Sequence, residues 1–131
     1  SNVCSSDLCK ENELNPIFVV APSSNDERLQ KVVSAAGGFV YAASLMGVTG
    51  ARNQISNAAE VLVNRVRKFT KLPVCVGLGV STASQAESVA NYADGVIVGS
   101  AFINALNSAS DFKSGVVAVN KLAKELKAGI S

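Results

Sequence analysis

Two glycine-bearing segments of this sequence could bind an anion. The first, GLGVS at residues 77–81, precedes a helix expected to begin at Thr82, and the second, GSAF at residues 99–102, leads from an apolar run into a short helix. Glycine allows a ligand to approach the backbone closely, and the first N–H groups of a helix have no partner within the helix. Each segment alone is also explained as a packing turn. Together, at one edge of a sheet, they predict a phosphate-binding site.

A third candidate is the long segment LMGVTGARNQIS at residues 45–56, which shows no periodicity. Connections of this length between a strand and a helix are often ligand loops or lids. Gly47 and Gly50 supply hinge-capable backbone and Thr49 supplies a hydroxyl. Arg52 is either a phosphate-steering group or an ordinary charge on a surface loop. The segment is therefore interpreted as a lid over the site, with a tolerated surface insertion as the alternative.

The residues that are absent limit the chemistry. The 131 residues include no histidine, which excludes histidine metal sites and imidazole acid–base catalysis. None of the ten carboxylates directly follows an apolar run, where a general acid or base would meet a ligand, and Asp94 precedes the fourth run. Cys4, Cys9 and Cys75 have no metal-ligand spacing and suit a reducing compartment, so packing is expected for Cys75.

Net charge and hydropathy limit the partners and the cellular compartment expected for this chain. The net charge of +2 creates no strong field for nucleic acid or an anionic membrane, so neither is expected as a partner. No apolar stretch reaches the ~20 residues of a membrane span. A cytoplasmic protein is therefore expected.

The elements that must position these segments are four continuous apolar runs. They occupy residues 17–21 (IFVVA), 39–43 (FVYAA), 74–78 (VCVGL) and 95–98 (GVIV). Continuous rather than alternating apolar runs are typical of strands in a buried parallel sheet. Regular alternation with helical segments predicts right-handed β/α units in a single domain. Tyr41, within the second run, points either into a barrel interior or into the helical layer.

Helix signals lie between these runs. Ser24 with Glu27 and Thr82 with Gln85 match capping boxes, and Asn57 is expected to open another helix. The last helix is expected over residues 113–127, with an inward stripe of Val116, Val119, Ala123 and Leu126. Residues 7–14 are expected to end a helix that leads into the first run. Residues 1–8 are expected to be a non-native leader, because VCSSDL at residues 3–8 resembles a translated sequencing adaptor. The single domain is then residues 9–131.

Three stretches together carry a family resemblance. FVYAASLMGVTGAR, LPVCVGLGVSTASQ and ADGVIVGSAF resemble the tryptophan synthase alpha chain, in unbroken register over about residues 16–106. The resemblance implies half of a TIM (β/α)8 barrel, four parallel β/α units corresponding to strands 5–8. It implies a lyase that cleaves indole-3-glycerol phosphate to indole and glyceraldehyde 3-phosphate in tryptophan biosynthesis, without a metal or organic cofactor. Indole would pass to a beta chain that carries pyridoxal phosphate.

The resemblance also assigns roles to residues. Those around the substrate phosphate would be Gly50, Leu78, Gly79, Gly99 and Ser100. Thr49 would support the catalytic aspartate when the lid closes, and Tyr41 would line the indole pocket. Leu45 and Met46 stand where some members place an arginine and a serine, so a lid contact by that arginine is not expected.

The family's two catalytic carboxylates lie in the first half of the barrel. This chain is therefore expected to bind phosphate and to turn over no substrate, and its open sheet edges would favour self-association. Two alternatives stay open. One is another phosphate-binding β/α-barrel enzyme, and the other is a non-catalytic module that binds a phosphorylated metabolite.

Overall fold

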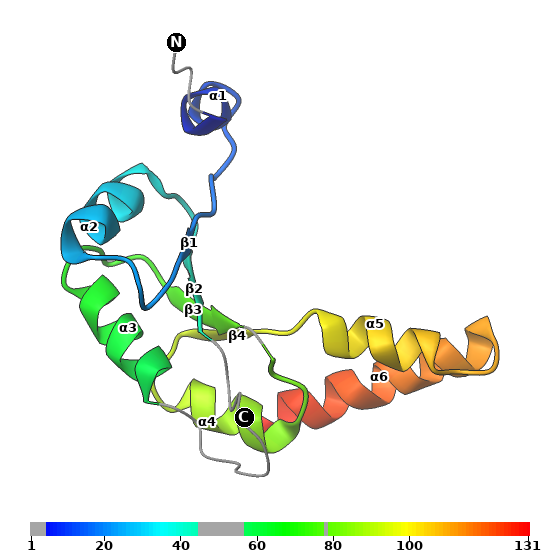
Figure 1. Ribbon diagram of the computed structural model, residues 1–131. Coiled ribbons are helices and arrows are strands. Elements are labelled where there is room, and N and C mark those ends of the chain that lie inside the picture. Colours follow the sequence, from blue (N-terminus) through cyan, green and yellow to red (C-terminus); the bar gives the residue numbers. More distant parts are fainter. Residues whose placement is uncertain (1–4, 45–56, 78) are drawn as a thin grey trace.

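The computed structural model describes residues 5–44, 57–77 and 79–131 of the chain, which form a parallel sheet flanked by helices (Figure 1). The strands are β1 (Val19–Val20), β2 (Val40–Ala43), β3 (Val74–Gly77) and β4 (Gly95–Ile97), in the order β1-β2-β3-β4. The helices are α1 (Ser5–Glu11), α2 (Asp26–Ala35), α3 (Ala58–Arg67), α4 (Ala83–Ala90), α5 (Ser100–Asn107) and α6 (Phe112–Gly129). The predicted β/α alternation and parallel sheet are confirmed.

One face of the sheet carries the core. Alternate strand residues point to opposite faces, and the set that faces the helices is almost fully buried: Val20, Val40, Ala42, Val74 and Val76 are each 0–2% exposed. Against them pack apolar side chains of the helices, among them Leu29, Val33, Leu62, Val63, Val66, Ala86, Val89 and Leu126. The other face is less covered, because Val19 is 60% exposed and its neighbours in the same row, Tyr41 and Cys75, are half-buried.

Of the two capping boxes predicted from the sequence, one is confirmed and the other is wrong. Thr82 and Gln85 form the predicted capping box at α4. The predicted box of Ser24 with Glu27 is wrong, because the N-cap of α2 is Asn25, whose side chain accepts from the Arg28 N–H at 2.8 Å. Ser24 belongs to the preceding turn instead: its N–H donates to the Ala21 carbonyl at 2.9 Å. The turn delays the helix by one residue.

Other boundaries also differ from expectation. Asn57 lies at the N-cap of α3, but its side chain makes no capping hydrogen bond. β1 is shorter than the expected five-residue run, because only Val19 and Val20 pair with β2. Residues 1–4 lie outside the described residues, whereas residues 5–8 form the start of α1. The prediction of a non-native leader over residues 1–8 stays a prediction.

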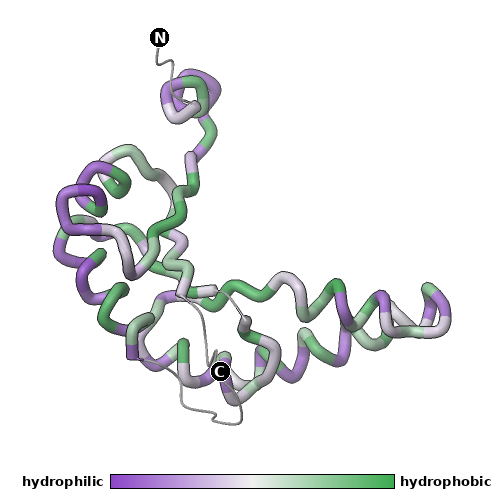
Figure 2. Tube along the Cα trace, in the orientation of Figure 1, coloured by the Kyte–Doolittle hydropathy of each residue, from purple (hydrophilic) through white to green (hydrophobic). Residues whose placement is uncertain are grey.

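Helices α5 and α6 form a hairpin that projects from the sheet, and the second half of α6 returns over α4 (Figure 1). A Cβ at Gly115 would lie 2.6 Å from the Leu106 Cδ1, so glycine permits the close packing of the two helices. Of the predicted inward stripe on α6, only Leu126 is buried, while Val116 is 48% exposed. Apolar residues alternate with polar ones along the hairpin (Figure 2). Several of these apolar residues are exposed, among them Ile103 at 60% and Val117 at 65%.

Candidate functional site

The two glycine-bearing segments begin at neighbouring strands. Gly77 of β3 pairs in register with Ile97 of β4, and the strands are parallel. Their carboxyl ends therefore lie at one edge of the sheet, where ligands of parallel β/α folds bind. Gly79 has a φ of +80°, a left-handed conformation that favours glycine and turns the chain from β3 toward α4.

The N-terminus of α4 is closed by its own side chains. The Gln85 Oε1 atom accepts from the Ser81 N–H at 2.8 Å and from the Thr82 N–H at 3.2 Å. The Thr82 Oγ1 atom accepts from the Gln85 N–H at 3.2 Å. These N–H groups are therefore occupied without a ligand. The α4 terminus offers an anion fewer donors than its sequence indicates.

The N-terminus of α5 has no such closure. Its N-cap is Gly99, which has no side chain to accept a hydrogen bond, and a Cβ placed there would meet nothing within 4 Å. The Gly99 carbonyl accepts from the Phe102 N–H at 3.0 Å, which starts the helix, while Gly99 and Ser100 are exposed. First-turn N–H groups together with the helix dipole favour a bound anion. Among the described residues, this terminus is the better candidate phosphate site.

Tyr41 reaches this edge from β2 along the less covered face of the sheet. A Cβ at Gly77 would lie 2.8 Å from the Tyr41 Oη and 2.8 Å from the Ile97 Cβ, so the tyrosine ring extends to the end of β3. This geometry decides between the two orientations left open by the sequence. Tyr41 lies on the face opposite the helical layer, which corresponds to a barrel interior.

Ser44 is a residue that sequence reasoning missed. It follows β2, is 3% exposed, and donates its N–H to the Gly77 carbonyl at 3.2 Å. The bond extends the pairing of β2 with β3 up to the ligand edge and so fixes the position of the Gly77 backbone. Its polar side chain after an apolar run was the only available signal.

The remaining predicted site residues fall into two groups. Gly79, Gly99 and Ser100 lie in the segments that follow the adjacent strands β3 and β4, and Tyr41 approaches the end of β3. Thr49, Gly50 and Leu78 lie outside the described residues, as do Gly47, Arg52 and the rest of the expected lid.

All ten carboxylate side chains of the sequence lie in the described residues, and none is on a strand. Asp94 is at the opposite edge of the sheet, where it accepts from the Val74 N–H at 2.9 Å and pairs with Arg67 at 3.1 Å. The hydrogen bonds from Val74 and Arg67 lower the pKa of Asp94. Asp26 binds Arg65 at 2.8 Å. These two carboxylates tie elements of the fold together.

Two further features bear on chemistry. Burial, with a smaller contribution from Asp94, raises the pKa of the Cys75 thiol, and Gly95 leaves space for it because a Cβ there would lie 2.7 Å from the Cys75 Sγ. Packing therefore explains this cysteine.

Within the part of the chain that the structure describes, no group of side chains could hold a metal ion, and no helix has the length and hydropathy to span a membrane.

Known proteins match this chain over nearly its whole length. The family model described as "Tryptophan synthase alpha chain" matches residues 2–131. The alpha chain of Streptomyces avermitilis is 55% identical over 121 residues, which are 92% of this chain and 44% of that protein. The chain belongs to the tryptophan synthase alpha chain family. The alpha chain of Acidothermus cellulolyticus is 56% identical over 117 residues, covering 89% of this chain and 43% of that protein.

Solved structures confirm the fold. A tryptophan synthase from M. tuberculosis superposes with a TM-score of 0.80 at 45% identity, covering 95% of this chain and 44% of that chain. The tryptophan synthase of Pyrococcus furiosus gives a TM-score of 0.79 at 32% identity, covering 94% and 49%. The chain thus spans under half the length of these tryptophan synthase alpha chain relatives, and its four β/α units match half of a TIM barrel. Because the chain belongs to the tryptophan synthase alpha chain family, the alternative of another phosphate-binding β/α-barrel family is not supported.

Proposed function

We propose that this chain contributes the phosphate-binding side of an active site for the lyase reaction of the family. The substrate would be indole-3-glycerol phosphate, and the products indole and glyceraldehyde 3-phosphate. One observation carries the proposal. The N-terminus of α5 presents uncapped, exposed backbone beside Gly99 at the carboxyl edge of the sheet, next to the loop that follows β3.

The proposed binding mode uses backbone more than side chains. The N–H groups of Gly99 and Ser100 would donate to the phosphate oxygens, and the positive end of the α5 dipole would favour the negative charge. Leu78, Gly79 and Gly50 would complete the phosphate site, as the family resemblance implies. Because the phosphate is common to substrate and product, these contacts would supply binding and orientation rather than a chemical step.

The other assigned residues would act on the organic part of the substrate. Tyr41 would line the indole pocket, since its ring lies on the interior face and ends beside Gly77. Thr49 would support the catalytic aspartate from the lid. No metal or organic cofactor is proposed. In the complete enzyme, the partner would be the tryptophan synthase beta chain, which carries pyridoxal phosphate and would receive the indole.

We propose further that the 131-residue chain binds phosphate but does not cleave the substrate. Carbon–carbon cleavage needs one group to take the hydroxyl proton of the glycerol moiety and another to protonate the indole carbon. Histidine is absent, and the carboxylates lie on helices, at a helix start, in the turn that follows α1 (Glu13) or, as with Asp94, at the opposite edge. The acid–base groups would come from other β/α units of a full barrel.

An NMR titration with glycerol 3-phosphate tests the site. We expect weak, saturable shifts of the Gly79, Gly99 and Ser100 amides. The N-terminus of α6 is an internal control, because Asp111 already caps it by accepting from the Ser114 N–H at 2.7 Å. Equal shifts at the α6 terminus, or no shifts at Gly99 and Ser100, would contradict the proposal. Glycerol in place of glycerol 3-phosphate should shift neither the Gly79, Gly99 and Ser100 amides nor the α6 terminus.

A further inference from the structure

The helices that begin at the proposed phosphate site differ in charge from the other helices that the structure describes. Neither α4 nor α5 has an acidic residue in its first turn or at its N-cap. The other helices have one or more there: Asp7 in α1, Asp26 and Glu27 in α2, Glu60 in α3, and Asp111 at the N-cap of α6. The helix dipole favours a carboxylate at a helix start. Both helices at the proposed site lack this common source of stabilisation.

Gln85 caps α4 without adding a charge. Its Oε1 atom accepts hydrogen bonds from the Ser81 N–H at 2.8 Å, the Thr82 N–H at 3.2 Å and the Ser81 Oγ at 3.3 Å. All three partners are donors, so a carboxylate at residue 85 would accept the same three bonds. Glutamate and glutamine both serve at this position of a capping box. Local geometry therefore does not require the neutral amide.

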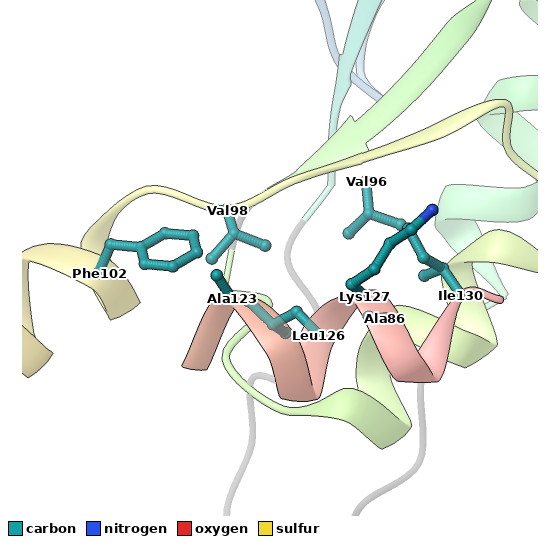
Figure 3. Close-up of a pocket in the computed structure, with 8 residues that line it drawn as sticks. All are labelled: Ala86, Val96, Val98, Phe102, Ala123, Leu126, Lys127 and Ile130. Carbon is teal, nitrogen blue, oxygen red and sulfur yellow. The ribbon is translucent and has the colours of Figure 1, made fainter. Parts of the chain in front are cut away.

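Helix α6 holds the first turn of α4 in place. A Cβ at Gly129, at the end of α6, would overlap the Ala83 carbonyl oxygen, so the two backbones approach closely. One turn earlier on α6, Leu126 lines an apolar cavity of about 280 Å³ together with Ala86 of α4 (Figure 3). The start of α4 is thus fixed by packing as well as by its cap. A charge at residue 85 could leave the ligand edge only by breaking the capping box.

We propose that Gln85 is a positioning residue whose neutral cap orders the loop between β3 and α4 without weakening phosphate binding. This role rests on the proposed function, in which Gly79 borders the phosphate. Gln85 orders the Ser81 and Thr82 backbone as a glutamate would, but it places no negative charge beside a phosphate dianion. A glutamate at this position would strengthen the cap and repel the ligand.

The distance from Gln85 to the proposed site follows from the chain. The Gln85 Oε1 lies 2.8 Å from the Ser81 nitrogen. Ser81 follows Gly79 by two residues, which span at most about 7 Å. A carboxylate at residue 85 would therefore lie within about 10 Å of the Gly79 N–H group. Over such a distance, its repulsion of a dianion should weaken binding about two- to fivefold at low salt.

Gln85→Glu tests the proposal, with Gln30→Glu as the matched control. Both substitutions replace an amide by a carboxylate of nearly the same shape and make the same change in net charge. Gln30 is exposed on α2, the helix that follows β1, and β2 separates β1 from β3. Gln85→Glu keeps the three acceptor bonds, so its thermal melt should lie no lower than that of the parent. A merely structural role for Gln85 would then leave phosphate binding unchanged.

NMR titrations with glycerol 3-phosphate at about 50 mM and about 500 mM salt give the readout, because the Debye length falls from about 14 Å to about 4 Å. We expect Gln85→Glu to bind about two- to fivefold more weakly than the parent at the lower salt concentration and equally at the higher one. Gln30→Glu should bind as the parent does at both.

Three results would overturn the role of Gln85: equal binding by Gln85→Glu and the parent at low salt, an equal loss in Gln30→Glu, or a loss that persists at high salt. If the parent binds and Gln85→Glu binds equally well, the proposed phosphate site stands and only the role of Gln85 is refuted. A parent chain that binds no glycerol 3-phosphate would overturn the proposed function and the role of Gln85 together.

Discussion

Gly99→Asp separates phosphate binding from folding at the N-terminus of α5. Space is available, since a Cβ at this position meets nothing within 4 Å, and the φ of −124° is outside the left-handed region that favours glycine. Aspartate is a favourable N-cap, so the helix should gain a few tenths of a kcal/mol relative to glycine. The same carboxylate would occupy the N–H groups proposed to bind phosphate and would repel its charge.

The magnitude follows from these two effects. Hydrogen bonds to charged groups contribute about 1.5–3 kcal/mol each. Two negative charges about 5 Å apart near a protein surface repel by about 1–3 kcal/mol. Allowing for partial solvent screening, Gly99→Asp should weaken phosphate binding by about 2–4 kcal/mol, which is about 30- to 1000-fold. Gly99→Asn adds a cap without a charge and should weaken binding by about tenfold.

The assay is an NMR or calorimetric titration with glycerol 3-phosphate, together with a thermal melt. Ser110→Asp is the matched control, because it makes the same charge change in the turn between α5 and α6. We expect Ser110→Asp to bind as the parent does, and Gly99→Asp to melt no lower than the parent. If a folded Gly99→Asp protein binds glycerol 3-phosphate as tightly as the parent, the assignment of the phosphate site to α5 is refuted.

Three further predictions concern the opposite end of the sheet. Gly95→Ala should destabilise the fold by about 1–3 kcal/mol, because the new Cβ would lie 2.7 Å from the Cys75 Sγ. Urea unfolding measures this loss. The double variant Gly95→Ala with Cys75→Ala should regain most of it. Asp94→Asn should lower the free energy of unfolding at pH 7 by about 1 kcal/mol, because it weakens the bonds from Val74 and Arg67. The loss is small because solvent screens this partly exposed pair. The pKa of Asp94 is lowered in the folded state, so ionised Asp94 stabilises the fold fully above the unfolded pKa of about 3.9. This stabilisation is lost as the pH falls through the folded-state pKa. The free energy of unfolding of Asp94→Asn should lack this dependence on acid pH. The raised pKa of Cys75 should make its alkylation at pH 8 slower than that of glutathione by mass spectrometry, and equal rates would contradict its burial.

The sequence predicted the strand positions well because continuous apolar runs reflect burial, which local composition records. It predicted strand lengths less well, since pairing depends on neighbours that are distant in the chain. Within the described residues, β1 pairs with β2 alone and is only two residues long, although the run at residues 17–21 is as apolar as the others. The start of α2 was misplaced because a turn at Pro22 and Ser24 competes with the cap.

The sequence predicts where the candidate site lies, but not which of its two glycine-bearing segments is free to bind an anion. By sequence alone, both segments suit an anion equally. The structure distinguishes them because the Gln85 side chain folds back on the N–H groups of Ser81 and Thr82, whereas Gly99 has no capping side chain. Long-range contacts were also beyond local patterns, as with the Arg65 side chain that binds Asp26 across 39 residues.

The most direct test of the central claim measures binding and turnover in one sample. The chain is titrated with glycerol 3-phosphate and then incubated with indole-3-glycerol phosphate, while indole release is followed. We expect saturable binding at Gly99 and Ser100 and no indole release above the uncatalysed rate. Indole release by the parent chain that Gly99→Asp abolishes would contradict this expectation, because acid–base groups would then be present within these 131 residues.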